Sequence, residues 1–197
     1  MAVRDLPLFP LRTVLFPGGD LRLRVFEPRY LDLVRQCSRD GSPFGVALIL
    51  EGVEAGGPAL PAATGTLARI IDFYTLPDGL LGLRCVGESR FRVRQTRMRD
   101  TGLIIGEIES IQDFAAEPVA PQHGLLAQLL ERLLDHFGGP HADAGKAQLD
   151  DAHWVGFRLA EMLPFTDEAR QALLELDSAA DRLDRILDAL PQFQSEG

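Results

Sequence analysis

The chain has 197 residues, of which 46% are hydrophobic and 25% are charged, and its net charge is −9. That composition is ordinary for a globular protein and excludes a largely disordered chain. No apolar run approaches the roughly 18 residues needed to span a bilayer, and the first residues show no secretory signal pattern, so we expect a cytoplasmic protein without membrane contact.

Charge is unevenly divided along the chain. Residues 1–115 hold 14 arginines and 14 acidic residues, whereas residues 116–197 hold six basic residues and 15 acidic ones. The segment 117–121, which contains two prolines, follows directly after this shift. We therefore predict two domains, 1–115 and 116–197, and the acidic second domain should repel nucleic acid.

The first domain has the pattern of short strands separated by turns. Alternating residues and short apolar runs predict seven strands, at residues 3–9, 21–25, 44–50, 65–76, 80–86, 89–98 and 103–111. A helix over residues 27–38 interrupts them, because Pro28 suits a first helical turn and apolar residues follow at helical spacing. Residues 51–63 are rich in Gly and Pro, which predicts a long mobile loop. Strands at this spacing favour a barrel.

The second domain has helical periodicity. Apolar stripes and capping residues predict four helices, at residues 122–137, 150–163, from about 166, and 178–190. The short connections between them favour antiparallel packing into a small bundle. The fold class predicted for the whole chain is therefore α+β.

A series of motifs runs through the chain in order. They are LPLFPLRTVLFPGGDLRLRVFEPRYLDLV, PFGVALI, GTLARIIDF, LPDGLLGLRCVGESRFRV, RLAEMLPF and QALLELD. Together they resemble the amino-terminal domain of the Lon ATP-dependent protease. The resemblance implies a PUA-like, mostly antiparallel β-barrel followed by a small helical bundle, which agrees with the strand and helix patterns. It also implies a role in recognising and holding polypeptide substrates.

No pattern of catalytic residues stands out. Residues 140–147 come nearest to a phosphate-binding P-loop, but Pro140 replaces its first Gly and Ala147 replaces its hydroxyl residue. The single lysine, Lys146, has no serine nearby to form a catalytic dyad. The histidines lack metal-site spacing, and Cys37 and Cys85 match small core residues. We therefore expect no enzyme activity, cofactor or metal in these residues, although the resemblance links the chain to ATP-dependent proteolysis.

Five apolar residues are candidates for binding a polypeptide. Val53 and Leu60 lie in the predicted loop, and Trp154, Phe157 and Phe165 would act as anchors if exposed. We predict that they bind unfolded or exposed apolar segments in a groove between the barrel and the helical domain. Such a protein would recognise substrates or act as an adaptor, with a protease as a candidate partner. The sequence leaves the clients and the oligomeric state open.

A basic stripe raises a second possibility. Arg90, Arg92 and Arg94 should share the outer face of a strand whose Phe91 faces the barrel interior. We favour a solvated stripe paired with acids such as Glu109, ahead of contact with the acidic half. The alternative function is RNA binding, which other PUA-like barrels perform, although the stripe lacks an aromatic platform for bases.

Overall fold

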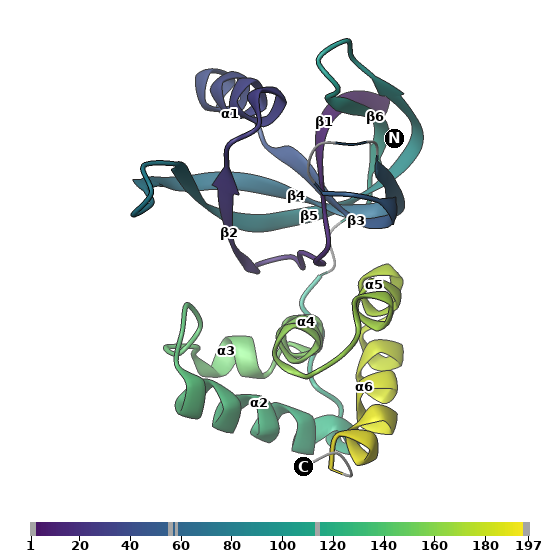
Figure 1. The fold of residues 1–197 in the computed structure, drawn as a ribbon. Coiled ribbons are helices and arrows are strands. Elements are labelled where there is room, and N and C mark those ends of the chain that lie inside the picture. The colour runs from purple at the N-terminus through teal and green to yellow at the C-terminus, as the bar shows by residue number, and fades with distance from the viewer. Residues whose placement is uncertain (1–2, 55–56, 58, 113–114, 195–197) are drawn as a thin grey trace. The chain divides into compact units, whose positions relative to one another are not determined.

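The computed structural model describes residues 3–54, 57, 59–112 and 115–194. Contacts divide the chain into two compact units, Met1–Asp113 and Phe114–Gly197, and each is described by itself. The boundary lies two residues before the predicted one. The α+β class, with a mostly antiparallel barrel in the first unit and helices in the second, is confirmed (Figure 1).

The first unit is a six-stranded sheet with one helix. Its elements are β1 (Val3–Leu11), β2 (Asp20–Val25), α1 (Pro28–Asp40), β3 (Phe44–Gly52), β4 (Ala59–Thr75), β5 (Leu81–Met98) and β6 (Ile104–Ser110). The strand order is β2-β5-β4-β3-β1-β6, and β6 also pairs with β5, so five strands close into a barrel and β2 extends from it (Figure 1). Among the described strands, β1 and β3 are the parallel pair and the other pairings are antiparallel.

Strand β5 replaces two predicted strands. The predicted break near Gly87 is absent, and the strand runs unbroken for 18 residues. Its first half pairs with β2, its second half pairs with β6, and β4 pairs along its other edge. A Cβ atom on Gly87 would lie 2.1 Å from the carbonyl oxygen of Phe16. The glycine therefore permits the segment between β1 and β2 to cross closely over the strand, rather than forming a turn.

The predicted loop over residues 51–63 is also wrong in extent. Strand β3 continues to Gly52 and β4 begins at Ala59, so the connection spans only residues 53–58. Within it, residues 55, 56 and 58 lie outside the described part of the chain. The pairing is irregular opposite Pro61. A bulge accommodates a proline that cannot donate a ladder hydrogen bond, which is why Gly and Pro here did not end the strands.

Helix α1 covers one part of the barrel core. It begins at Pro28, one residue later than predicted, and ends at Asp40. The next residue, Gly41, has a φ of 62° and closes the last turn by donating its N–H to the carbonyl of Cys37. Its buried face packs on a cluster that contains Phe9, whose ring stacks on Tyr30 with centroids 3.8 Å apart. Cys37 and Cys85 lie in this cluster as free thiols, as predicted.

The second unit is built from helices. They are the 3-10 helix η1 (Pro121–His123), α2 (Gly124–Phe137), α3 (Lys146–Leu149), α4 (Ala152–Met162), α5 (Asp167–Glu175) and α6 (Ala179–Gln194). The four predicted helices correspond to α2, α4, α5 and α6. The four-residue α3 escaped prediction because one turn carries no periodicity. In the part of the chain that the structure describes, helices long and apolar enough for a membrane span are lacking.

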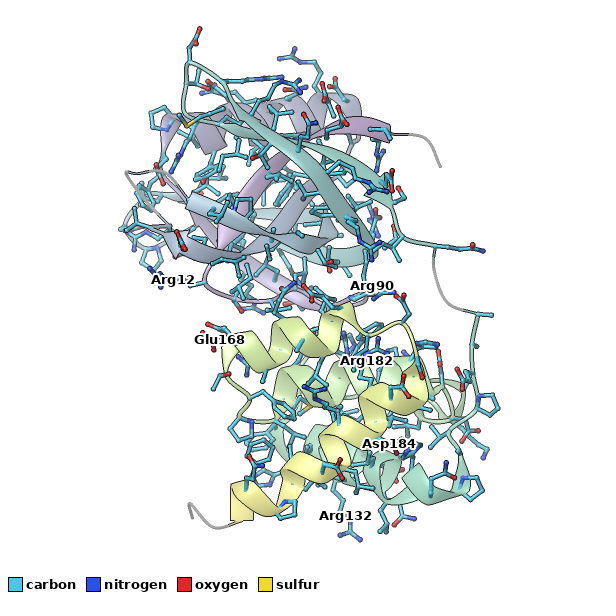
Figure 2. The ribbon with its side chains drawn as sticks, turned by 90° about the vertical axis from the view of Figure 1, so that its right-hand side faces the viewer. Arg12, Arg90, Arg132, Glu168, Arg182 and Asp184 are labelled. Carbon is cyan, nitrogen blue, oxygen red and sulfur yellow. The ribbon has the colours of Figure 1, made fainter. Side chains whose placement is uncertain are left out.

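The helical core contains buried arginines as well as leucines. Figure 2 shows Arg182 within the helical unit, where its Nε donates to the carbonyl of Leu173 at 3.0 Å and a terminal nitrogen donates to the carbonyl of Leu176. Its guanidinium carbon lies 4.1 Å from the ring centre of Phe157, and its other nitrogen lies 3.3 Å from Nδ1 of His153. Phe157 is therefore a core residue. The prediction that it is exposed to bind polypeptide is wrong, because its ring packs against this guanidinium.

Candidate functional site

β1 and β2 follow each other in the chain but do not pair with each other in the part that the structure describes. β1 pairs with β6 as far as Leu8 and with β3 from Leu8 to Leu11. β2 pairs only with β5 among the described strands. The edge of β1 beyond Leu8 and one whole edge of β2 are therefore unpaired. Figure 1 shows β1 and β2 apart from each other, joined by the segment that runs between them.

A pocket of about 330 Å³ lies between these two strands, lined by the end of β1, by β2 and by the start of α1. Its floor is apolar, because Phe9, Leu11, Leu23 and Tyr30 line it and are themselves buried in the core. Phe26 also lines it, and 51% of this side chain is exposed. The pocket therefore offers a preformed apolar surface with an aromatic side chain at its rim.

Local sequence explains why Phe26 is outside. Leu23 and Val25 point inward along β2, and the helix begins two residues after Phe26, at Pro28. Phe26 takes the next, outward position of the strand alternation. An apolar residue at an outward strand position is therefore a local signal of this pocket.

The charged residues of the same motif fix the helix start. Arg29 pairs with Glu27 at 3.0 Å and donates to the carbonyl of Gly102 at 3.1 Å, in the turn between β5 and β6. Its guanidinium carbon also lies 4.7 Å from the ring centre of Tyr30. Burial raises the pKa of the Tyr30 hydroxyl, so the ring stays neutral at physiological pH. These contacts hold one wall of the pocket in place.

The connection between β3 and β4 lies beside the pocket. The backbone N–H of Arg12 donates to Oε1 of Glu54 at 2.8 Å, and the Arg12 side chain donates to the carbonyl of Gly52 at 2.9 Å. Glu54 lines the pocket. Of the predicted binding residues, Val53 precedes Glu54 and Leu60 lies on β4, both about half exposed. Neither lines the pocket, and their role stays a prediction.

The helical unit holds the remaining predicted aromatics. Trp154 is half-buried and packs edge-on against His141, with ring centres 5.8 Å apart. Phe165 packs edge-on against Phe193 at 5.1 Å and lines a second pocket of about 480 Å³ between α5 and α6. The structure does not bring Trp154 into this pocket. Their role in binding also stays a prediction, as does a groove between the two units.

The predicted basic stripe does not form. Arg90 is only 2% exposed, so its placement on a solvated face is wrong. It lies opposite Thr66 on β4, and the hydroxyl of Thr66 donates to the carbonyl of Leu15 at 2.6 Å. The segment between β1 and β2 therefore covers this face. Figure 2 labels Arg90 within the barrel unit.

The other two arginines of the stripe are exposed. Arg94 pairs with Glu109 at 2.5 Å, which confirms the predicted pairing with acids at this position, and Arg92 lies opposite Glu109 in the strand register. The Arg94 guanidinium holds the pKa of the Glu109 carboxyl below its usual range. Within the described ranges, no three His, Cys, Asp or Glu side chains gather closely enough to hold a metal ion.

Comparison with known proteins identifies the domain. The family model of the ATP-dependent protease La (LON) substrate-binding domain matches residues 5–192. A crystal structure of a Lon N-terminal domain protein from Xanthomonas campestris is 48% identical, with a TM-score of 0.80, and the match covers 94% of this chain and 98% of that one. The N-terminal domain of Mycobacterium avium complex Lon protease shares the fold, with a TM-score of 0.65 at 16% identity, covering 94% of this chain and 97% of that one.

Longer relatives are similar over the same region. Lon protease 2 of Myxococcus xanthus is 25% identical over 194 residues, which are 94% of this chain and 23% of that protein. Lon protease of Cytophaga hutchinsonii is 23% identical over 94% of this chain and 24% of its own length. The chain thus spans about a quarter of these curated relatives. It belongs to the family of Lon substrate-binding domains.

Proposed function

We propose that this domain binds exposed apolar segments of other polypeptides in the pocket between β1 and β2. One observation carries the proposal: strand pairing stops over an apolar floor, and half of the Phe26 side chain is exposed at its rim. What distinguishes Phe26 from other exposed apolar residues is its place on this pocket, where a bound segment would bury its ring together with the apolar floor. The family description as a substrate-binding domain supports a polypeptide as the ligand.

The proposed role is recognition without catalysis. The matched family model is that of the substrate-binding domain, and the sequence offers neither a P-loop nor a Ser–Lys dyad. In this proposal the domain holds clients in cytoplasmic protein quality control, and a protease carries out the cleavage. RNA binding is not retained as a second function, because Arg90 is buried and Arg94 is paired with Glu109.

Binding should be weak. The pocket is small, and binding must offset the entropy lost when an unfolded segment becomes ordered. A dissociation constant in the micromolar range, on the order of −8 kcal/mol, is the expected affinity.

The test compares two exposed phenylalanines of the same unit. Phe26 lines the pocket, whereas Phe73 is 49% exposed on β4 and does not line it. We expect Phe26→Ser to weaken binding of a fluorescein-labelled peptide with alternating valines about tenfold or more, because burial of a Phe side chain contributes about 1.5–3 kcal/mol. Phe73→Ser should change the affinity less than about twofold. Fluorescence anisotropy measures both, and thermal melting verifies that each variant is folded.

Two results would overturn the proposal. One is that the unmodified protein binds no apolar peptide at concentrations up to the millimolar range. The other is that Phe73→Ser weakens binding as much as Phe26→Ser does, which would move the site away from the pocket.

A further inference from the structure

The free edge of β2 carries backbone groups with no strand to pair with. The N–H of Gly87 donates to the carbonyl of Gly19 at 2.9 Å, just before the paired register begins. That register then runs without a shift to the pair Val25 and Leu81. Because antiparallel ladders bond at every second residue, the bonds to β5 continue through Leu21, Leu23 and Val25. The amide and carbonyl groups of the residues between them point away from β5.

These outward groups border the pocket. Arg22 and Arg24 both line the pocket. In the described part of the chain, β5 is the strand that pairs with β2, so the outward backbone groups of these two arginines have no partner strand. An exposed strand edge is a template for another extended chain, which gains main-chain hydrogen bonds by adding to the sheet. With six residues in β2, the edge has room for about five or six client residues at about 3.3 Å each.

The faces of β2 determine where client side chains would lie. Leu23 and Val25 are buried, and Arg22 and Arg24 are exposed on the opposite face. In an added strand, alternate side chains would likewise point to the pocket floor and to water. A segment with apolar residues at every second position therefore matches both the hydrogen-bonding edge and the apolar floor.

Charge at the rim adds a preference. Arg24 pairs with Asp78 at 2.5 Å, and Glu27 pairs with Arg29 at 3.0 Å. Asp20 is held by Arg84 at 2.5 Å, whereas Nε of Arg22 lies 3.8 Å from it and the Arg22 side chain is 68% exposed. Two arginines thus share one carboxylate, which leaves positive charge at Arg22. An acidic client residue on the outer face would complement it.

We propose that the client binds as an added β-strand along the free edge of β2, with apolar side chains alternating into the pocket and an acidic side chain opposite Arg22. The inference rests on the proposed function. It adds a mode of recognition by the client backbone and a preference for alternating, acidic segments.

The first test uses N-methylated forms of the labelled peptide. One form is methylated at the odd-numbered amides and the other at the even-numbered amides, so the side chains stay identical. Only one of these two sets of amides faces β2 in an added strand. The form methylated at that set should bind at least about 30-fold more weakly than the parent peptide, because several main-chain hydrogen bonds are lost. The other form should bind within about threefold of the parent. Equal effects of the two forms would overturn strand addition while leaving polypeptide binding intact. A parent peptide that does not bind would overturn the proposed function itself.

The second test alters the protein. Arg22→Pro removes an outward N–H without removing a bond to β5, and prolines are tolerated at such edge positions. Arg22→Ala removes only the side chain and is the matched variant. We expect Arg22→Pro to bind about tenfold more weakly than Arg22→Ala, since one hydrogen bond is lost and the approach of the client is blocked. Both should lose the preference for glutamate over lysine in the client. Equal binding by the two variants, with both melting like the unmodified protein, would contradict the proposal; if Arg22→Pro melts lower, the N-methylated peptides decide alone.

Discussion

In the barrel, the side chains packed beneath α1 are apolar and aromatic, whereas in the helical unit Arg158, Arg182, His123 and His153 are also buried. The difference follows from how each unit satisfies its backbone. Strand ladders pair their own amides and carbonyls, but a helix leaves its last carbonyls without partners. Arg182 donates to two carbonyls at the end of α5, those of Leu173 and Leu176. The helical unit thus uses buried polar side chains to satisfy a helix end, whereas one edge of β2 in the described part of the barrel pairs with no strand.

Each unit contains its own spectroscopic or chemical probe. Both cysteines, Cys37 and Cys85, lie in the barrel and are buried. The single tryptophan, Trp154, lies on α4 of the helical unit. Thiol labelling therefore reports opening of the barrel, and tryptophan fluorescence reports unfolding of the helices. The stabilities of the two units can therefore be measured separately in the same protein.

The largest expected effect is in the barrel. Phe91 is fully buried in an apolar cluster of the barrel that also contains Leu8 and Ile108. We expect Phe91→Ala to lower the free energy of unfolding of the barrel by about 3–5 kcal/mol, because it removes apolar contacts and leaves a cavity. Thiol labelling in urea should show the loss, and Trp154 fluorescence should not. The control is Arg92→Ala, at the exposed residue next to Phe91, which should change neither the thiol labelling nor the Trp154 fluorescence. An equal shift of both probes would show that the units unfold together.

A smaller loss is expected in the helical unit. We expect Arg182→Met to destabilise the helices by about 2–4 kcal/mol, because two carbonyls lose their donor, and buried groups without a partner cost about 1–3 kcal/mol each. Trp154 fluorescence in urea measures the effect. Arg185→Met is the control, since Arg185 lies on the same helix but is exposed. An unchanged midpoint for Arg182→Met would show that the two carbonyls do not need the guanidinium.

A third effect depends on pH and is again specific to the barrel. Burial raises the pKa of the Cys85 thiol to about 12. The unfolded thiol ionises near pH 8.5, so the folded barrel binds more protons between these values and loses stability as pH rises through them. We expect a slope of about 1 kcal/mol per pH unit between pH 9 and 11, at most about 1.4 from this thiol. Urea titrations followed by circular dichroism measure it. Cys85→Val should flatten the slope, and an equal slope in that variant would assign it to other groups.

Much of the fold was predictable because the signals are local. The alternation at Leu21, Leu23 and Val25 and the helical spacing after Pro28 each depend on neighbouring residues, and both elements were found within two residues of their observed ends. The strand break predicted near Gly87 was wrong, because the requirement for glycine at this position comes from a distant segment of the chain. Only the structure shows that the Phe16 carbonyl crosses that position, so glycine serves close approach rather than a turn.

The site was less predictable for the same reason. The pocket exists because pairing stops between β1 and β2, which are consecutive in sequence but are not neighbours in the sheet. No local pattern marks an unpaired edge. Val53 and Leu60 were predicted to bind polypeptide because they lie in a predicted loop, but much of that loop is strand. Phe157 was also predicted to bind, but it is buried. Phe26 was the one site residue with a local signal, as an apolar side chain at an outward position.

The smallest expected effect concerns the exposed pair of Arg94 and Glu109 on the barrel surface. Its charges are screened by water and salt, so Arg94→Gln should leave the urea midpoint of the barrel unchanged within error at pH 7 and 0.15 M salt. Because Arg94 lowers the pKa of Glu109, whatever the pair contributes is present above the unfolded pKa of a glutamate, about 4.3, and is lost as pH falls through the lower folded value. Any difference between Arg94→Gln and the unmodified protein should therefore be largest at pH 7 in low salt and smaller at pH 3. Thiol labelling in urea at pH 7 and circular dichroism at pH 3 measure the two conditions. A large loss at pH 7 would mean that the barrel surface depends on this ion pair in the way that the helical core depends on Arg182.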